Sequence, residues 1–214
     1  LRRMINHKIV KIKRSKKYSD RFIIYFENKS VLRVSEDAFV LNPMKVGDLL
    51  SDSDIKELDD KMNLHEAKEA AYRLLSYRMR SIAELSKRLI EKGFNDVEIE
   101  FVVNHLIELN YLNDEDFGKA FILEKVKSKK IGPVALRFEL VQHKLPSELS
   151  NMLIEKIYDE FPINKLISFH LDKRKIIKNT ILNKKDKNRL NNFLKRKGFY
   201  WDSIVSVYSE WGIL

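Results

Sequence analysis

The residues that could do acid–base or metal chemistry are a few scattered histidines and one run of carboxylates. The five histidines are His7, His65, His105, His143 and His170. No two of them have the H-x-x-x-H spacing of a helical zinc site, and Glu69 stands where an HExxH motif beginning at His65 would need its second histidine. The sequence has no cysteine, no phosphate-binding glycine loop and no nucleophile elbow. We therefore expect a non-enzymatic protein with no catalytic residue, no metal site and no cofactor.

Two polar patterns in the middle of the chain have a structural interpretation that we favour. Asp114-Glu115-Asp116 could suggest a metal, but negative charge is favourable in the first turn of a helix and no second ligand cluster accompanies it. Ser81 and Glu84 have the S-x-x-E spacing of a capping box. Arg80, which precedes them, is then left either to pair with a neighbouring carboxylate or to contact a partner.

Positive charge is the chemical property that this chain has in excess. It carries 41 Lys and Arg against 31 Asp and Glu, a formal net charge of +10. Residues 1–34 hold 11 basic and 2 acidic groups, and residues 159–214 hold 12 and 6. Such a surplus indicates an acidic partner, which would be nucleic acid, a nucleoprotein or an anionic membrane surface. A solvated face without a specific role is the alternative for each basic run.

The binding candidates are basic residues spread along the helical part of the sequence. They are Arg73, Arg78, Arg80, Lys87, Arg88, Lys92, Lys127, Lys129, Lys130, Arg137, Lys173, Arg174, Lys175, Lys195, Arg196 and Lys197, with Lys125, Lys184 and Lys185 beside them. Phe199, Tyr200, Trp201 and Trp211 could stack on bases. Trp211 falls in a core register, however, and a core role is the favoured interpretation of this aromatic group.

The first fifty residues read as a small β-rich extension. Residues 5–34 contain three apolar groups separated by polar turns, beginning at Ile5, which predicts a three-stranded antiparallel meander. Residues 35–37 can cap a short helix that Pro43 ends. A helix beginning at residues 51–54 then either continues into residues 70–78 or bends near Asn63.

Residues 70–112 form the clearest unit in the sequence. Three amphipathic helices can be read from them, and the third has a continuous apolar stripe from Ile99 to Ile107. Gly93 fits the left-handed end of the second helix, and Asn95 or Asp96 can cap the third.

The same pattern recurs twice further along the chain. The second-helix positions Leu85, Leu89 and Phe94 return after 51 residues as Leu136, Leu140 and Leu145, and after 54 more as Leu190, Leu194 and Phe199. First-helix positions return every 46 residues instead, from Ala71 to Phe117 to Ile163. The extra residues therefore fall in loops, which absorb length better than packed helices do.

These observations predict a mainly α fold of three tandem three-helix repeats in an elongated curved array, with a small N-terminal antiparallel β-meander and a linking helix. The predicted boundaries are 1–50 for the β-rich extension, 51–70 for the linking helix, and 71–112, 113–158 and 159–214 for the repeats. The alternative is that three amphipathic helices recur by chance within one compact bundle.

No apolar run approaches the roughly 18 residues that span a bilayer. The first ten residues are too polar for a signal peptide. We therefore expect a soluble, cytoplasmic monomer without a membrane partner.

At this point three segments are specific enough to suggest a family. They are Arg80-Ser81-Ile82-Ala83-Glu84-Leu85, then Lys92-Gly93-Phe94, then Tyr111-Leu112-Asn113-Asp114. In this order they resemble the RecX family of bacterial regulators of the recombinase RecA. The resemblance covers residues 65–158 well and residues 159–214 more loosely.

The resemblance implies a non-enzymatic protein of tandem three-helix repeats that binds in the groove of the RecA filament on single-stranded DNA. There it would modulate RecA, usually by inhibiting ATP hydrolysis and strand exchange. The expected partners are the RecA filament and single-stranded DNA, with duplex DNA left open. The alternative is a free-standing DNA-binding regulator with a helix-turn-helix-like pair, but residues 95–108 hold four carboxylates and no Lys or Arg, which suits a DNA groove poorly.

Overall fold

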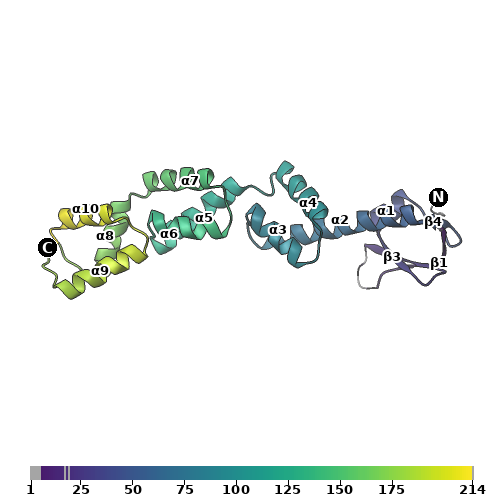
Figure 1. Cartoon of the computed structure of the whole chain (residues 1–214), viewed down its shortest axis with the longest axis horizontal. Coiled ribbons are helices and arrows are strands. Elements are labelled where there is room, and N and C mark those ends of the chain that lie inside the picture. The colour runs from purple at the N-terminus through teal and green to yellow at the C-terminus, as the bar shows by residue number, and fades with distance from the viewer. Residues whose placement is uncertain (1–5, 17, 19, 214) are drawn as a thin grey trace. The chain divides into compact units, whose positions relative to one another are not determined.

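The computed structural model describes residues 6–16, 18 and 20–213. Within them the chain is mainly helical, with one small sheet near its beginning (Figure 1). The strands are β1 (Asn6–Arg14), β2 (Arg21–Phe26), β3 (Val31–Ser35) and β4 (Leu49–Ser51). The helices are α1 (Glu36–Leu41), α2 (Asp52–Tyr77), α3 (Ile82–Glu91), α4 (Asp96–Glu108), α5 (Asp114–Lys129), α6 (Pro133–Gln142), α7 (Ser147–Glu160), α8 (Ile163–Lys173), α9 (Lys184–Arg196) and α10 (Trp201–Trp211).

The chain divides into two compact units. The first comprises Leu1–Arg78 and Ser86–Leu109, and the second comprises Met79–Leu85 and Asn110–Leu214. No helix among the described residues is long and apolar enough to cross a membrane.

The sheet of the first unit has four strands, one more than the sequence predicts. Its order is β3-β2-β1-β4, and every neighbouring pair is antiparallel. The meander of β1, β2 and β3 is confirmed, although Ile5 lies outside the described residues. The sequence did not indicate the fourth strand, because β4 is three residues long and gains its partner, the beginning of β1, from more than forty residues away. Such a strand has no local signature.

One face of this sheet is buried against helices. Ile9, Ile24 and Val34 are fully buried there and pack with Ala38 of α1 and Leu58 of α2. A β-bulge between Ile9 and Lys11 shifts the alternation of β1 by one residue, because Ile9 pairs with Phe26 whereas Lys11 pairs with Tyr25. After the bulge the lysines of β1 therefore stand on the face away from the core.

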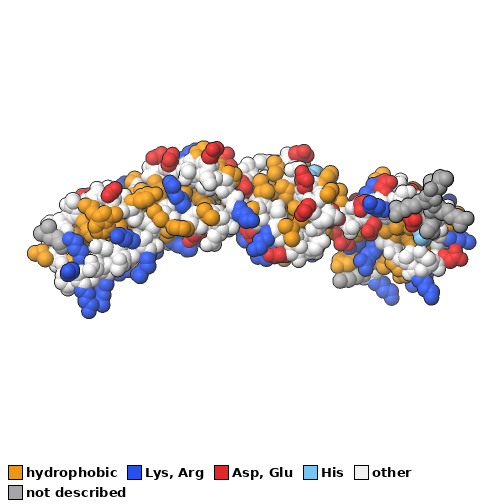
Figure 2. All heavy atoms as spheres, in the orientation of Figure 1, with side chains coloured by type: hydrophobic (Ala, Val, Ile, Leu, Met, Phe, Trp, Pro, Cys, Tyr) orange, Lys and Arg blue, Asp and Glu red, His pale blue; other side chains and the backbone are white. Residues whose placement is uncertain are grey.

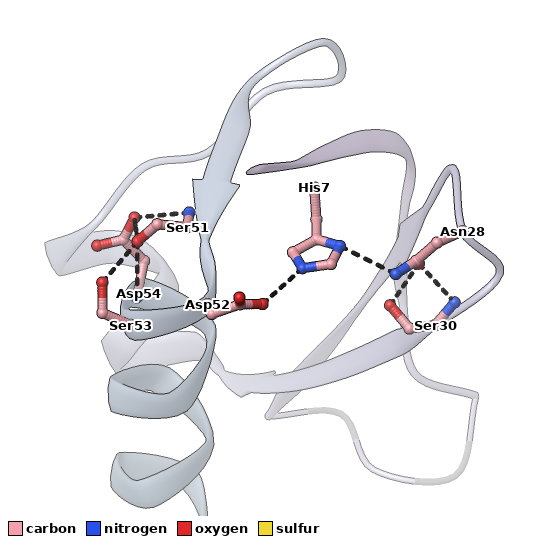
Figure 3. Close-up of polar contacts among 7 residues, drawn as sticks. All are labelled: His7, Asn28, Ser30, Ser51, Asp52, Ser53 and Asp54. Atoms are coloured by element: carbon pink, nitrogen blue, oxygen red, sulfur yellow. Dashed lines mark hydrogen bonds and ion pairs between the residues drawn. The ribbon is translucent and has the colours of Figure 1, made fainter. Parts of the chain in front are cut away.

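His7 joins three parts of the first unit (Figure 3). Its Nε2 lies 2.7 Å from the carboxylate of Asp52 at the start of α2, and its Nδ1 lies 2.9 Å from the amide nitrogen of Asn28 in the β2–β3 turn. The neutral ring with its hydrogen on Nε2 satisfies both contacts, since it donates to Asp52 and accepts from Asn28. Ser51 and Asp54 form a capping box beside it. The first strand is thus pinned to the beginning of the long helix.

The helices of the first unit begin and end much as the sequence predicts. Ser35 caps α1 through its Oγ, and α2 runs without a break from Asp52 to Tyr77, which excludes the bend near Asn63. Gly93 follows α3 with φ +92°, and Asn95 caps α4 in a capping box with Glu98. The predicted apolar stripe of α4 is buried at four positions, whereas Ile107 at its end is 42% exposed.

The second unit has one continuous apolar core. Helices α5, α6 and α7 pack on one another, and α10 packs on both α8 and α9. The second-helix positions predicted for the second and third copies are all buried: Leu136, Leu140, Leu145, Leu190, Leu194 and Phe199. Leu153, Ile157, Val207 and Trp211 are buried with them. The grouping of the helices into three repeats with the stated boundaries stays a prediction, which these packing partners support.

Capping at the start of the second unit comes from both predicted patterns. The Oγ of Ser81 accepts a hydrogen bond of 3.1 Å from the amide of Glu84. Asn113 caps α5, and the acidic run Asp114 to Asp116 occupies the first turn, as expected. Asp114 also contacts α3, because its carboxylate accepts a 2.8 Å hydrogen bond from the backbone amide of Ile82, the first residue of that helix. Burial raises the pKa of Asp114 even though this bond favours the charged form.

Candidate nucleic-acid interface

A basic groove lies in the second unit where the C-terminal ends of α5, α8 and α9 meet. We call it the C-terminal groove; its volume is about 490 Å³. It is lined by Ser128, Lys129, Lys130, Phe169, His170, Lys173, Arg174, Phe193 and Lys197. The last turn of each of the three helices carries basic side chains, which the negative end of a helix dipole stabilises. Three such ends in one place concentrate positive charge, and Figure 2 shows Lys and Arg side chains gathered around α9.

The groove has an aromatic lining beneath its cations. The guanidinium of Arg174 lies 3.7 Å from the ring centroid of Phe193, and the ammonium of Lys197 lies 5.8 Å from the same centroid. Lys130 stands over Phe169 at 5.6 Å, and Phe169 is 43% exposed. Cation–π contacts hold these charged groups over flat apolar surfaces without neutralising them. The groove therefore offers rings and unneutralised charge side by side.

His170 is the buried polar residue at the base of the C-terminal groove. Its Nε2 lies 2.7 Å from the carbonyl oxygen of Lys130, so Nε2 donates this hydrogen bond. A neutral ring with its hydrogen on Nε2 is sufficient to make it. Burial lowers the pKa of His170; the bond to Lys130 opposes this, and the nearby charges of Lys197 and Arg174 add to it. The histidine is thus an uncharged connector in a positive environment.

One carboxylate next to the groove restrains two of the candidate lysines. The Glu139 carboxylate on α6 lies 2.7 Å from the ammonium of Lys125 and 3.2 Å from that of Lys129. Burial opposes ionisation of Glu139, but the two lysines outweigh it and lower its pKa, and Glu139 in turn raises the pKa of Lys125. Glu139 is not itself part of the groove lining. The charge of Lys129 is consequently only partly available to a ligand.

A second groove lies in the first unit, between the sheet and α2. We call it the sheet–helix groove; its volume is about 720 Å³. Two sequence-predicted candidates, Arg73 and Lys92, line it together with Arg21 and Arg33 of the sheet. Arg21 is paired with Glu66. The structure thus brings the predicted candidates of the first repeat next to basic residues of the β-rich extension, which sequence reasoning did not include.

The other candidates fall into two groups. Arg80 is 10% exposed and pairs with Glu84, and the Arg88 guanidinium lies 2.7 Å from Glu91, so both have a carboxylate partner. For Arg80 the structure favours the pairing interpretation. The remaining candidates are exposed outside the two grooves: Arg78, Lys87, Lys127, Arg137, Lys175, Lys195 and Arg196. Exposure of this kind is equally compatible with a solvated face.

The terminal aromatic residues separate into core and surface. Phe199 and Trp211 are 3% and 6% exposed, which supports the core interpretation for both. Trp201 is 45% exposed and lies beneath the ammonium of Lys195, at 4.8 Å from ring centroid to nitrogen. Sequence reasoning missed Phe169, Phe193 and His170, which line the C-terminal groove. Their spacing follows the helix period and gives no local sign that their rings meet lysines from another helix.

The arrangement suits binding of a polyanion more than chemistry on a substrate. The side chains lining the C-terminal groove include five cations and no carboxylate. Phosphate groups prefer such donors, and exposed rings beside them can stack on bases. In the part of the chain that the structure describes, no three histidine or carboxylate side chains come together as metal ligands.

Comparison with known proteins identifies the family. Residues 67–106 match the family described as RecX, first three-helix domain. The chain is 30% identical to the regulatory protein RecX of Bacillus velezensis over 202 residues, which cover 94% of this chain and 76% of that protein. This chain belongs to the RecX family. The RecX proteins of Bacillus subtilis and Clostridium tetani are 30% and 22% identical and cover 94% and 95% of the chain; the matches span 76% and 94% of those proteins.

Two solved RecX structures have the same fold. One, a crystal structure of regulatory protein RecX, has a TM-score of 0.68 at 21% identity and covers 95% of this chain and 97% of its own. The other, RecX from Lactobacillus salivarius, has a TM-score of 0.60 at 18% identity and covers 70% and 97%. The relatives are named as regulatory proteins, in agreement with a non-enzymatic role.

Proposed function

We propose that this RecX-family chain is a modulator of the RecA recombinase that acts as an inhibitor. It would bind in the groove of the RecA filament on single-stranded DNA and thereby block ATP hydrolysis and strand exchange. Its membership of the family supports a regulatory role. The partner is proposed from the resemblance of the residue segments 80–85, 92–94 and 111–114 to RecX.

The observation that carries the proposal is the composition of the C-terminal groove. It combines Lys130, Lys173, Arg174 and Lys197 with the rings of Phe169 and Phe193. A ligand that satisfies both kinds of group has phosphates and accessible bases, as single-stranded DNA does. Duplex DNA exposes phosphates but keeps its bases stacked, so it is the weaker candidate of the two.

The proposal is tested by RecA-dependent ATP hydrolysis on circular single-stranded DNA. Increasing amounts of the chain are expected to lower the rate to a small residual value. A variant with Lys173→Ala and Arg174→Ala removes two of the cations that line the C-terminal groove. The smaller alanine side chains do not fill the groove. We expect this variant to need about tenfold more protein for half inhibition, because two charge contacts to the nucleoprotein are lost.

The matched control is Lys156→Ala with Lys165→Ala. It removes the same charge from two exposed positions of the second unit, one on α7 and one in the first turn of α8, at the opposite end of α8 from the groove. The control should inhibit nearly as well as the parent chain, and circular dichroism should confirm that both variants are folded. An unchanged rate of hydrolysis at saturating parent chain would overturn the proposed function.

The free-standing helix-turn-helix regulator is not favoured by the structure of its recognition helix. That helix would be α4, whose first turn carries Asp96 and Glu98 and which lacks Lys and Arg. An acidic helix would be repelled by DNA phosphates. The proposed partner also implies a cytoplasmic protein, and we propose that it acts as a monomer, which sedimentation velocity would test.

A further inference from the structure

The sheet of the first unit has an outer face whose residues resemble those of a nucleic-acid platform. Residues directly opposite one another in neighbouring strands share a face. Lys13 is opposite Ile23, which is opposite Arg33, so these three form one row across β1, β2 and β3. Lys11, Tyr25 and Val31 form the next row. Cations at the sides thus flank an apolar and aromatic centre.

Lys11 and Lys13 lie close together on this face. Contact with Lys13, together with repulsion between the two ammonium groups, lowers the pKa of Lys11. Among the residues that the structure describes, no carboxylate lies within ion-pair distance of Lys11, Lys13 or Arg33. Figure 2 shows Lys and Arg side chains gathered where Figure 1 draws β1 and β3. An anion would relieve this repulsion.

The outer face continues into the sheet–helix groove. Ile23 and Arg33 belong both to the outer face and to the groove lining. On its other side the groove is lined by Arg73 and Tyr77 of α2 and by Lys92, which follows α3. A volume of about 720 Å³ is in the range of ligand sites that enclose small molecules or single nucleotides.

The charged side chains that line the sheet–helix groove also favour the binding of an anion. Its two carboxylates are Glu66 and Glu69, and Glu66 is already paired with Arg21. Neither Arg73 nor Lys92 has a carboxylate within ion-pair distance in the described part of the chain. Three cations, counting Arg33, therefore face a single remaining carboxylate.

Aromatic side chains stand next to these cations. Tyr77 is 80% exposed at the edge of the groove. Tyr18 is 41% exposed, and the guanidinium of Arg21 lies 4.2 Å from its ring centroid. Exposed rings between cations are the combination that holds unpaired bases, because every base has a face that can stack. A recessed groove also favours a flexible strand over a flat membrane surface.

We propose that the outer face of the N-terminal sheet and the sheet–helix groove together bind single-stranded DNA. Lys11, Lys13 and Arg33 contact its phosphates, Arg73 and Lys92 extend this contact into the groove, and Tyr25 and Tyr77 carry its bases. The inference deepens the proposed function, on which it rests for the identity of the nucleic acid, by assigning a strand-binding role to the β-rich extension.

The test measures binding of a fluorescent oligothymidylate by anisotropy, with the full chain and without RecA. The variant Lys11→Ala with Lys13→Ala removes two exposed cations whose backbone remains paired in the sheet. Its affinity should fall about tenfold, and the slope of log affinity against log salt should decrease by about 1.4, which corresponds to two phosphate contacts. Tyr77→Leu should weaken binding about fivefold, whereas Tyr77→Phe should retain it.

The matched control is Lys45→Ala with Lys56→Ala, which removes two exposed lysines of the same unit, one in the segment before β4 and one on α2, that do not belong to the rows of the outer face. It should bind the oligonucleotide nearly as the parent chain does. Equal affinities of the Lys11/Lys13 variant and this control would overturn the inference, as would tighter binding to anionic vesicles than to the oligonucleotide. Because RecA is absent from this measurement, its result does not depend on the inhibition assay. If the chain binds the oligonucleotide as expected but does not inhibit RecA-dependent ATP hydrolysis, the proposed function is contradicted and this inference is not.

Discussion

The amide of Gly132 donates a 2.7 Å hydrogen bond to the carbonyl oxygen of Lys197. Two residues further on, the amide of Val134 donates a 3.0 Å bond to the carbonyl of Gly198. The end of the α5–α6 loop and the first turn of α6 therefore pair, backbone to backbone, with the loop between α9 and α10. This pairing holds Lys197, whose carbonyl is one of the two acceptors, and Lys130, two residues before Gly132, at the same C-terminal groove.

Substitution of Gly198 should destabilise the second unit strongly. Its φ is +88°, and a Cβ built there would lie 2.3 Å from the backbone nitrogen of Ala135. Gly198→Ala combines the cost of a left-handed backbone with a clash against main chain, and should lower the free energy of unfolding by about 2–4 kcal/mol. Urea denaturation measures this loss in the free energy of unfolding.

Gly93→Ala is the matched control for this substitution. Gly93 has a similar φ of +92°, but a Cβ there would meet open space. Its cost should be limited to that of the left-handed backbone, about 1–2 kcal/mol. Equal destabilisation by the two substitutions would show that the close approach of the two loops contributes nothing.

Acid should weaken the second unit through His170. Its pKa in the folded chain is lowered by burial, below the value of about 6.5 that it has when unfolded. The unfolded state therefore binds the proton more readily, so the stabilising contribution is present above about pH 6.5 and is lost as the pH falls through the folded pKa. Thermal unfolding should show this loss as the pH is lowered through and below about 6.5, the unfolded value.

His170→Gln separates this titration from the hydrogen bond. A glutamine amide can still donate to the carbonyl of Lys130, which His170 Nε2 contacts at 2.7 Å, but it does not titrate. The variant should lose less stability than the parent chain over the same pH range. Parallel pH profiles for the two proteins would contradict the assignment to His170.

Ser81 should contribute more to stability than an ordinary helix cap. It is fully buried, its Oγ accepts from the amide of Glu84, and its hydroxyl donates a 2.9 Å bond to the carbonyl of His143. Ser81→Ala removes the cap and takes this donor away from a partly buried carbonyl, at a cost of about 2 kcal/mol. Asn183→Ala, which removes an exposed cap from the same unit, should cost about 1 kcal/mol. Equal values in urea denaturation would argue against a role for the bond to His143.

The sequence was sufficient to predict what depends on local spacing. The leucine register that relates Leu85 to Leu136 and Leu190 is a property of single helices, and all three residues are buried. The same holds for the left-handed Gly93 and for the cap at Asn95, because a few neighbouring residues decide them.

The candidate sites depend on contacts between distant segments, and the sequence predicted them only in part. Lys130 and Lys197 were recognised as basic, but their meeting depends on the pairing of Gly132 with Lys197. Phe193 could not be assigned to the groove, since its helical position fits a core residue equally well. The outer face of the sheet was missed because the bulge between Ile9 and Lys11 decides which way the lysines of β1 point.

Glu139 should act as a restraint on the C-terminal groove, and its removal should strengthen DNA binding. Its carboxylate holds the ammonium groups of Lys125 and Lys129 at 2.7 and 3.2 Å. Its lowered pKa keeps it charged at neutral pH. Glu139→Gln preserves the size of the side chain but releases both lysines from an ion pair. Affinity for oligothymidylate, measured by anisotropy at low salt, should rise about two- to fivefold.

Glu155→Gln provides the comparison that isolates the local effect. Glu155 is exposed on α7, and its substitution changes the net charge by the same amount. If the affinity for oligothymidylate rises more in Glu139→Gln than in Glu155→Gln, and if the difference disappears at high salt, the released positive charge acts in the C-terminal groove. Equal gains from both substitutions would mean that only the net charge of the chain matters, and would remove the support that this groove gives to the proposed function.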